Sequence, residues 1–154
     1  MTTSMRLRLL RAAGATIDPG AFVEAGISVV AGRISIGARS YINRQCLLDA
    51  RGGIEIGENT LVGPRVSFLT ATHPVMPDTP RAGPVVYESI TVGSNAWIGA
   101  AATLLPGCEV GDGCVVAAGS IVRGKLAPNT LHAGVPAVCK RSLAPLTPQL
   151  AQAG

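Results

Sequence analysis

The chain has 154 residues, of which 47% are hydrophobic and 14% are charged, a balance that excludes a disordered chain and suits one domain with a single core. Aromatic residues are scarce at 3% and glycine and proline are abundant, which disfavours a sandwich or doubly wound sheet filled by aromatic side chains. The formal net charge is +4, and no run of five or six basic residues predicts an arm for nucleic acid.

The first segment, residues 1–14, is expected to form a short helical cap. Arg6, Arg8 and Arg11 alternate with leucines there, and they interrupt the apolar stretch of roughly 7–15 residues that a signal peptide requires. No segment approaches the roughly 18 apolar residues of a membrane span. We therefore expect no membrane span, and a cytoplasmic location.

Residues 15–141 carry a six-residue repeat of large aliphatic residues. Its clearest run is Val92, Ile98, Leu104, Val110, Val116 and Val122. Because a strand turns alternate residues inward, a six-residue side ending in a turn-tolerant residue builds one wall, and three walls close a coil. Residues one coil apart, such as Val92 and Val110, should then stack. Apolar residues do not recur three and four positions apart, as they would in an amphipathic α-helix. The repeat therefore predicts a parallel β-helix.

The repeat extends toward the N-terminus in a less regular form. Its earlier members are Ile17, Val23, Val29, Ile36, Ile42, Leu48, Ile56, Val62 and Phe68. The step from Leu48 to Ile56 is two residues too long, which predicts an insertion near 51–53. Cys108 and Cys114 fall four residues after a repeat member. This is a small inward corner position, so we expect both cysteines to fill the core.

Between Phe68 and Val92 the repeat is interrupted, and residues 69–89 are expected to form a protruding loop. The segment contains four prolines, which are incompatible with a regular strand ladder. Long loops in compact domains are usually functional or disordered. Thr72-His73-Pro74 lies where this loop leaves the scaffold, and an imidazole is suited to accept a proton near neutral pH. His73 is therefore the candidate general base, the alternative being a turn histidine without a role.

Three segments resemble the hexapeptide-repeat acyltransferase superfamily, and most closely its short sugar O-acetyltransferase branch. They are YINRQCLLDARGGIEIGENTLVGPRVSFLTATHP (41–74), ITVGSNAWIGAAATLLPGCEVGDGCVVAAGSIV (90–122) and LHAGVPAVCKR (131–141). The resemblance implies a left-handed β-helix, a homotrimer with active sites between subunits, and acetyl-CoA as acyl donor without a metal. It also implies that His73 deprotonates an acceptor hydroxyl for direct attack on the thioester, without an acyl-enzyme.

The resemblance also implies residues for the acceptor. Asn43 matches an asparagine that positions substrate and acyl group, the alternative being a turn residue at the second position of the repeat. Tyr41 is expected to line the acceptor pocket. Asp49 and Arg51 lie where galactoside-type enzymes contact the sugar, but the Asp-Ala-Arg pattern makes a simple galactoside acceptor doubtful. Arg81, in the loop, is a candidate for holding the acceptor or else a solvated side chain.

A second set matches positions that contact coenzyme A in the family. Trp97 should point outward against the acyl-pantetheine groove or into a subunit interface. Ala100 and Ala118 match backbone contacts to the pantetheine arm. The basic residues expected near the phosphates are Arg123, Lys125 and Arg141. Each of these three could also be an ordinary surface charge.

Three other functions are alternatives at this stage. N-acyl transfer to an amino sugar or antibiotic would use the same scaffold. A zinc lyase would need three histidine ligands, whereas the chain has only His73 and His132, the latter read as structural. A non-catalytic solenoid of the ice-binding type would carry regular threonine arrays, which the sequence lacks. Residues 142–154 are expected to form a C-terminal tail outside the repeat.

Overall fold

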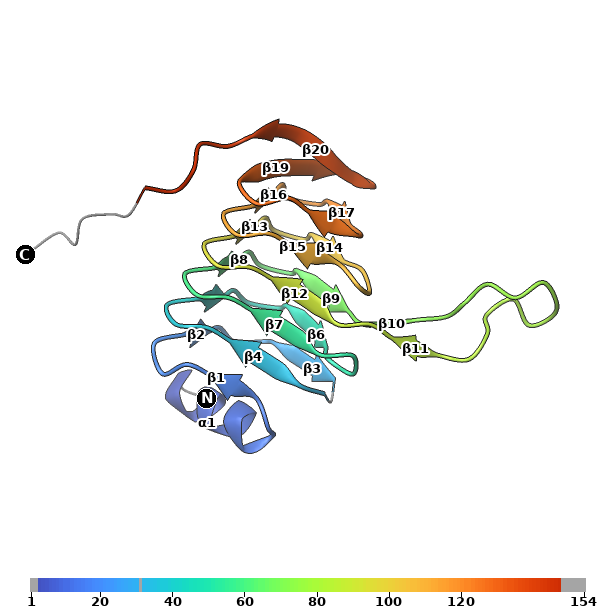
Figure 1. The fold of residues 1–154 in the computed structure, drawn as a ribbon. Coiled ribbons are helices and arrows are strands. Elements are labelled where there is room, and N and C mark those ends of the chain that lie inside the picture. The colour runs from blue at the N-terminus through green and yellow to red at the C-terminus, as the bar shows by residue number, and fades with distance from the viewer. Residues whose placement is uncertain (1–2, 31, 148–154) are drawn as a thin grey trace, which may run out of the picture.

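The computed structural model describes residues 3–30 and 32–147, and it shows a β-helix with three sheets (Figure 1). Sheet A contains β1 (Thr16–Ile17), β4 (Ile34–Ile36), β7 (Ile54–Ile56), β12 (Ile90–Val92), β15 (Glu109–Val110) and β18 (Lys125–Leu126). Sheet B contains β2 (Phe22–Val23), β5 (Tyr41–Ile42), β8 (Leu61–Val62), β13 (Trp97–Ile98), β16 (Val115–Val116), β19 (Thr130–Gly134) and β20 (Ala137–Ser142). Sheet C contains β3 (Ser28–Val30), β6 (Leu47–Asp49), β9 (Ser67–Leu69), β14 (Thr103–Leu104) and β17 (Ile121–Val122). This all-β solenoid confirms the predicted fold class.

The stacking predicted from the repeat is confirmed in all three sheets. Val92 pairs with Val110 in sheet A, Ile98 with Val116 in sheet B, and Leu104 with Val122 in sheet C, each in parallel register. All six side chains are buried. A narrow column of aliphatic side chains therefore forms the core, which explains why so few aromatic residues are needed.

The repeat departs from a step of six at a single corner, where sheet C leads into sheet A. Ile36 pairs with Ile56, two residues more than a regular coil, which confirms the predicted insertion. At the other end Val110 pairs with Leu126, so that coil is two residues short at the same corner. We name this edge the C–A corner. Because the C–A corner absorbs these irregular steps, sheet B keeps a regular parallel register from β2 to β19, and its register shifts only where β20 pairs antiparallel with β19.

Small polar residues at the inward corner positions donate hydrogen bonds to backbone carbonyls. Ser40 Oγ donates to Gly57 O at 2.6 Å, and Cys46 Sγ lies 3.3 Å from Gly63 O. Cys114 Sγ likewise lies 3.2 Å from Thr130 O. These contacts satisfy buried groups that a purely apolar corner would leave unpaired.

The buried cysteines give a prediction about thiol reactivity. Burial raises the pKa of Cys108 to about 12, and it also raises the pKa values of Cys46 and Cys114, whereas Cys139 is exposed. Because the thiolate is the reactive form, iodoacetamide at pH 8 should label Cys139 in the folded protein and all four cysteines after denaturation. Peptide mass spectrometry checks this result. Rapid labelling of Cys108 in the folded protein would contradict its assignment to the core.

Helix α1 (Thr3–Ala12) covers the N-terminal end of the prism (Figure 1). Leu7 is buried in the core, and Arg6 donates to the Val23 carbonyl at 2.6 Å while Arg11 donates to Ile17 O at 3.0 Å. The helix thus satisfies strand carbonyls at an open edge. Val29, in the edge strand β3, is 40% exposed and does not belong to the closed core.

At the C-terminal end, His132 takes the inward position of β19 and pairs with Val116. Its Nε2 lies 3.1 Å from Thr130 Oγ1, and burial lowers the pKa of the imidazole. The predicted tail falls outside the described residues from 148 onward. No helix within the described residues is long and apolar enough to cross a membrane.

Candidate active site

The interrupted part of the repeat forms an arm that projects from the C–A corner (Figure 1). Strand β10 (Ala71–Thr72) pairs antiparallel with β11 (Val86–Tyr87), and an isolated bridge joins Val75 to Ala82 further out. The sequence predicted a loop, and the structure shows that its root is a two-stranded hairpin. His73 follows β10 directly, so the hairpin fixes its backbone.

The imidazole of His73 is exposed, and one of its nitrogens is held by the arm itself. Nδ1 lies 2.6 Å from the carbonyl oxygen of Gly83, across the hairpin. A carbonyl can only accept a hydrogen bond, so Nδ1 carries the proton. In the neutral ring Nε2 is then the unprotonated nitrogen, available to take a proton from a substrate.

Asp49 and Arg51 are brought together at the root of the arm. The guanidinium donates two hydrogen bonds to the Asp49 carboxylate, both at 2.9 Å, which lowers the pKa of Asp49. Arg51 also lies over the ring of Tyr87, 5.1 Å from its centroid. Tyr87 pairs with Ala71 in the hairpin. Arg51 therefore connects the arm to the prism, because it contacts Tyr87 in the arm and Asp49 in the prism.

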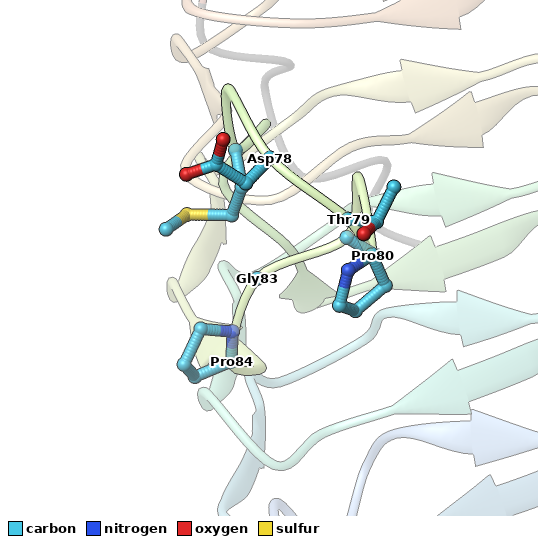
Figure 2. A pocket seen from close by; sticks show the side chains of 7 residues that line it. Asp78, Thr79, Pro80, Gly83 and Pro84 are labelled. Atoms are coloured by element: carbon cyan, nitrogen blue, oxygen red, sulfur yellow. The ribbon is translucent and has the colours of Figure 1, made fainter.

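The tip of the arm encloses a pocket of about 360 Å³ (Figure 2). In Figure 2, Asp78 and Pro84 lie on one side of the arm and Thr79 and Pro80 on the other. Arg81 does not line this pocket. Its guanidinium donates to the carbonyls of Met76 and Pro77 at 3.3 and 3.2 Å, so it stabilises the turn of the tip.

A long apolar groove of about 550 Å³ runs along the outside of sheet B. One wall is a ladder of outward side chains in which Leu61, Trp97, Val115 and Leu131 pair in successive coils. The other wall follows the corner between sheets B and C, and its small residues are Gly63, Pro64, Gly99, Ala100, Ala117 and Ala118. The shape fits an extended, narrow ligand.

Four predicted residues meet in this groove. Trp97 is 53% exposed and points outward as expected, and Ala100 and Ala118 line the opposite wall. Asn43 lies at the end of the groove nearest the N-terminal coils, and its Oδ1 accepts from Arg44 N at 2.8 Å. The amide N–H groups of Asn43 are therefore the donors that this side chain offers to a ligand.

The predicted phosphate contacts are dispersed. Arg141 pairs with Leu131 and so extends the groove ladder at its C-terminal end. Arg123 follows β17 at the C–A corner, and Lys125 begins β18 of sheet A and forms an ion pair with Glu109 at 3.0 Å. Within one chain Arg141 therefore lies beside the groove residue Leu131, whereas Arg123 and Lys125 lie at another edge of the prism.

Tyr41 lies on the same face of sheet B, below the groove. Its ring stacks on Phe22 with centroids 5.2 Å apart, and its hydroxyl donates to Glu24 at 2.7 Å. This hydrogen bond raises the pKa of Tyr41 and lowers that of Glu24. The Tyr41 hydroxyl and the Glu24 carboxylate are thus hydrogen-bonded to each other within the chain.

His73 and Asn43 are not brought together within one chain. Asn43 lies where sheet B leads into sheet C, whereas His73 extends from the C–A corner, at the other end of sheet C. A six-residue side spans up to roughly 20 Å. The two residues therefore belong to different edges of the prism.

Several groove residues were missed at the sequence level. Leu61 and Val115 each precede a repeat member by one residue, as Trp97 does, so the repeat itself could have identified this outward ladder. Gly83 carries no such signal, because its contact with His73 depends on how the arm folds back.

The comparisons agree with this architecture. Residues 89–124 match a family model described as bacterial transferase hexapeptide (six repeats). A hexapeptide-repeat acetyltransferase from Vibrio cholerae is 30% identical, with a TM-score of 0.85 over 94% of this chain and 83% of that one. A galactoside acetyltransferase solved with coenzyme A is 33% identical, with a TM-score of 0.80 over 91% of this chain and 70% of that one.

Among curated proteins, the galactoside O-acetyltransferase of Escherichia coli is 35% identical over 132 residues, which cover 85% of this chain. The chain spans 65% of that relative and 53% of a second galactoside O-acetyltransferase from Lactococcus lactis. The repeat, the fold and these identities agree. The chain belongs to the hexapeptide-repeat acyltransferase superfamily, in its sugar O-acetyltransferase branch.

Proposed function

We propose that the protein transfers an acetyl group from acetyl-CoA to a hydroxyl group of a sugar or saccharide acceptor. The observation that carries this proposal is the exposed His73 imidazole, whose Nδ1 is held by Gly83 O. Nε2 takes the proton of the acceptor hydroxyl as its oxygen attacks the thioester carbonyl. The tetrahedral intermediate then collapses, the C–S bond breaks, and the departing thiolate takes the proton from Nε2, which restores the neutral imidazole.

Asn43 and the groove supply the other half of this site. The apolar groove holds the pantetheine arm between Trp97 and the wall of Ala100 and Ala118. The Asn43 amide donates to the thioester oxygen as negative charge develops there. Arg141, at the far end, meets a phosphate of the donor. A cytoplasmic location is part of the proposal, since acetyl-CoA is made inside cells.

The active unit in this proposal is a homotrimer. His73 and Asn43 lie at different edges of one prism. In the proposed site, His73 of one subunit therefore meets Asn43 of a neighbouring subunit. Closed rotational symmetry then repeats the same site at every interface. Arg123 and Lys125 lie away from their own groove, so they can contact the donor only from the neighbour. The acceptor side of the site is stabilised by residues that fix the conformation of the arm and of the groove end, namely Asp49, Arg51, Arg81 and Tyr41.

Turnover of an acceptor panel tests the function. Release of free thiol from acetyl-CoA should rise with hydroxylated sugars and stay at background without an acceptor. The product should be an ester that is cleaved by hydroxylamine. An amide product from amino sugars alone would establish N-acyl transfer instead, and no acceptor-dependent thiol release would overturn the proposal.

Trp97 gives a prediction for donor binding. Since it is the only tryptophan and lines the groove, coenzyme A should change its fluorescence. Trp97→Ala should raise the KM for acetyl-CoA about tenfold, as expected for loss of an aromatic contact worth about 1.4 kcal/mol, while Trp97→Phe should retain most of the affinity. Unchanged emission together with an unchanged KM in Trp97→Ala would place the donor elsewhere.

A further inference from the structure

Two arginines stand at the Asn43 end of the groove. Arg44 and Arg65 directly follow Asn43 and Pro64, both of which line the groove. The backbone N–H of Arg65 donates to the carbonyl of Arg44 at 3.0 Å, so the two residues occupy neighbouring coils of the same corner. Both are exposed.

The charge of this pair is not balanced within the described chain. Ion pairs among the described residues engage Arg39 with Glu58, Arg51 with Asp49 and Lys125 with Glu109, and none engages Arg44 or Arg65. Glu24 follows β2 on the neighbouring coil of this corner. Its pKa is lowered chiefly by the Tyr41 hydroxyl and further by Arg44.

Glu24 offsets only part of this charge. It already accepts hydrogen bonds from the Tyr41 hydroxyl at 2.7 Å and from Ala25 N at 3.3 Å. One engaged carboxylate therefore offsets part of the Arg44 charge, and no ion pair among the described residues offsets the Arg65 charge. Guanidinium groups bind planar carboxylates and phosphates through paired hydrogen bonds, which are among the stronger polar contacts in proteins.

We propose that Arg44 and Arg65 form a subsite for a carboxylate or phosphate group on the saccharide acceptor. The inference rests on the proposed function, because Asn43 marks the end of the groove where the acetyl group meets its acceptor. An acidic sugar is thus preferred over its neutral counterpart, by a contact outside the reacting atoms. The carboxylate of a uronic acid and the phosphate of a sugar phosphate share the required chemistry.

The test measures kcat/KM for matched acceptors at saturating acetyl-CoA. Methyl glucoside is the neutral acceptor, and methyl glucuronide and glucose 6-phosphate are the anionic ones. The wild type should prefer at least one anionic acceptor about tenfold, as expected for a charge-assisted contact, and the preference should shrink as ionic strength rises. The double variant Arg44→Gln, Arg65→Gln should bring the ratio to about one.

A control variant tests the effect of overall charge. Arg39→Gln removes one positive charge, half the change made in the double variant, at another corner and from a residue paired with Glu58. Its ratio of kcat/KM values should equal that of the wild type. Using a ratio within each variant cancels any loss of folded protein. Larger preference for the uronide assigns the subsite to a carboxylate, and larger preference for the sugar phosphate assigns it to a phosphate.

Several results would overturn the inference. The inference fails if the wild type shows a ratio near one between kcat/KM for the anionic and the neutral acceptor. It also fails if that ratio persists in the double variant, or if it falls equally in Arg39→Gln. A raised KM for acetyl-CoA with an unchanged acceptor ratio would assign the arginines to the donor instead. In all these cases acetyl transfer itself is observed and the proposed function stands, whereas no turnover of any acceptor refutes both.

Discussion

Replacing His73 with glutamine is expected to lower kcat by about 10²–10⁴-fold, the usual contribution of a positioned general base. Glutamine retains an N–H group that can donate to the Gly83 carbonyl, as Nδ1 does, but it has no basic nitrogen. The loss should therefore appear in kcat and much less in the KM for acetyl-CoA, because the base acts on the acceptor hydroxyl and does not line the groove that holds the pantetheine arm. Acetyl-CoA-dependent thiol release over a range of acceptor concentrations measures both constants.

Structural damage has to be separated from loss of the base. Because His73 is exposed, His73→Gln should unfold at the same temperature as the wild type, within about 1–2 °C. Donor binding, followed through Trp97 fluorescence, should also be retained. Thiol release persisting at the wild-type rate in a folded His73→Gln protein would remove the imidazole from the mechanism.

Phe68→Ala is expected to cost about 3–5 kcal/mol of stability, the usual range for truncating a buried phenylalanine. Phe68 is fully buried in sheet C, where it pairs with Leu48 below and Leu104 above. The hydrogen-bonded coils below and above fix the backbone around Phe68, so the cavity left by the missing ring cannot collapse easily. Urea denaturation at one fixed protein concentration measures the loss, since the stability of an oligomer depends on concentration.

The only other phenylalanine provides the control. Phe22 points outward from sheet B, is 39% exposed and stacks on Tyr41. Phe22→Ala should cost no more than about 1.5 kcal/mol, the upper value for an aromatic pair. Equal losses for the two variants would contradict the division of the repeat into inward and outward positions.

The repeat made most of the fold predictable. A strand period of two and a side of six leave few ways to bury Val92, Ile98 and Leu104, so the stacking partners followed from numbering alone. The handedness of the β-helix did not follow from the numbering, because the spacing is the same for both hands. The left-handed winding was expected from the resemblance alone. The hairpin at the arm root was also hidden, since the prolines that exclude a regular coil do not exclude two short paired strands.

The candidate site was predictable only in part. Trp97, Ala100 and Ala118 were assigned to one groove from the resemblance, and the structure places all three in it. Asp49 and Arg51 were assigned to the acceptor, whereas the structure pairs them with each other and sets Arg51 against Tyr87. That contact joins residues 36 positions apart across the arm root, and no local pattern encodes it.

Mixed oligomers test most directly whether His73 and Asn43 come from different subunits. His73→Gln and Asn43→Ala should each be nearly inactive alone. When the two are denatured together in equal amounts and refolded, a site that joins His73 of one subunit to Asn43 of the next should recover about one quarter of wild-type activity in a random trimer. Activity no higher than that of the separate variants, in a confirmed mixed trimer, would show that each chain builds its own site and would contradict the account.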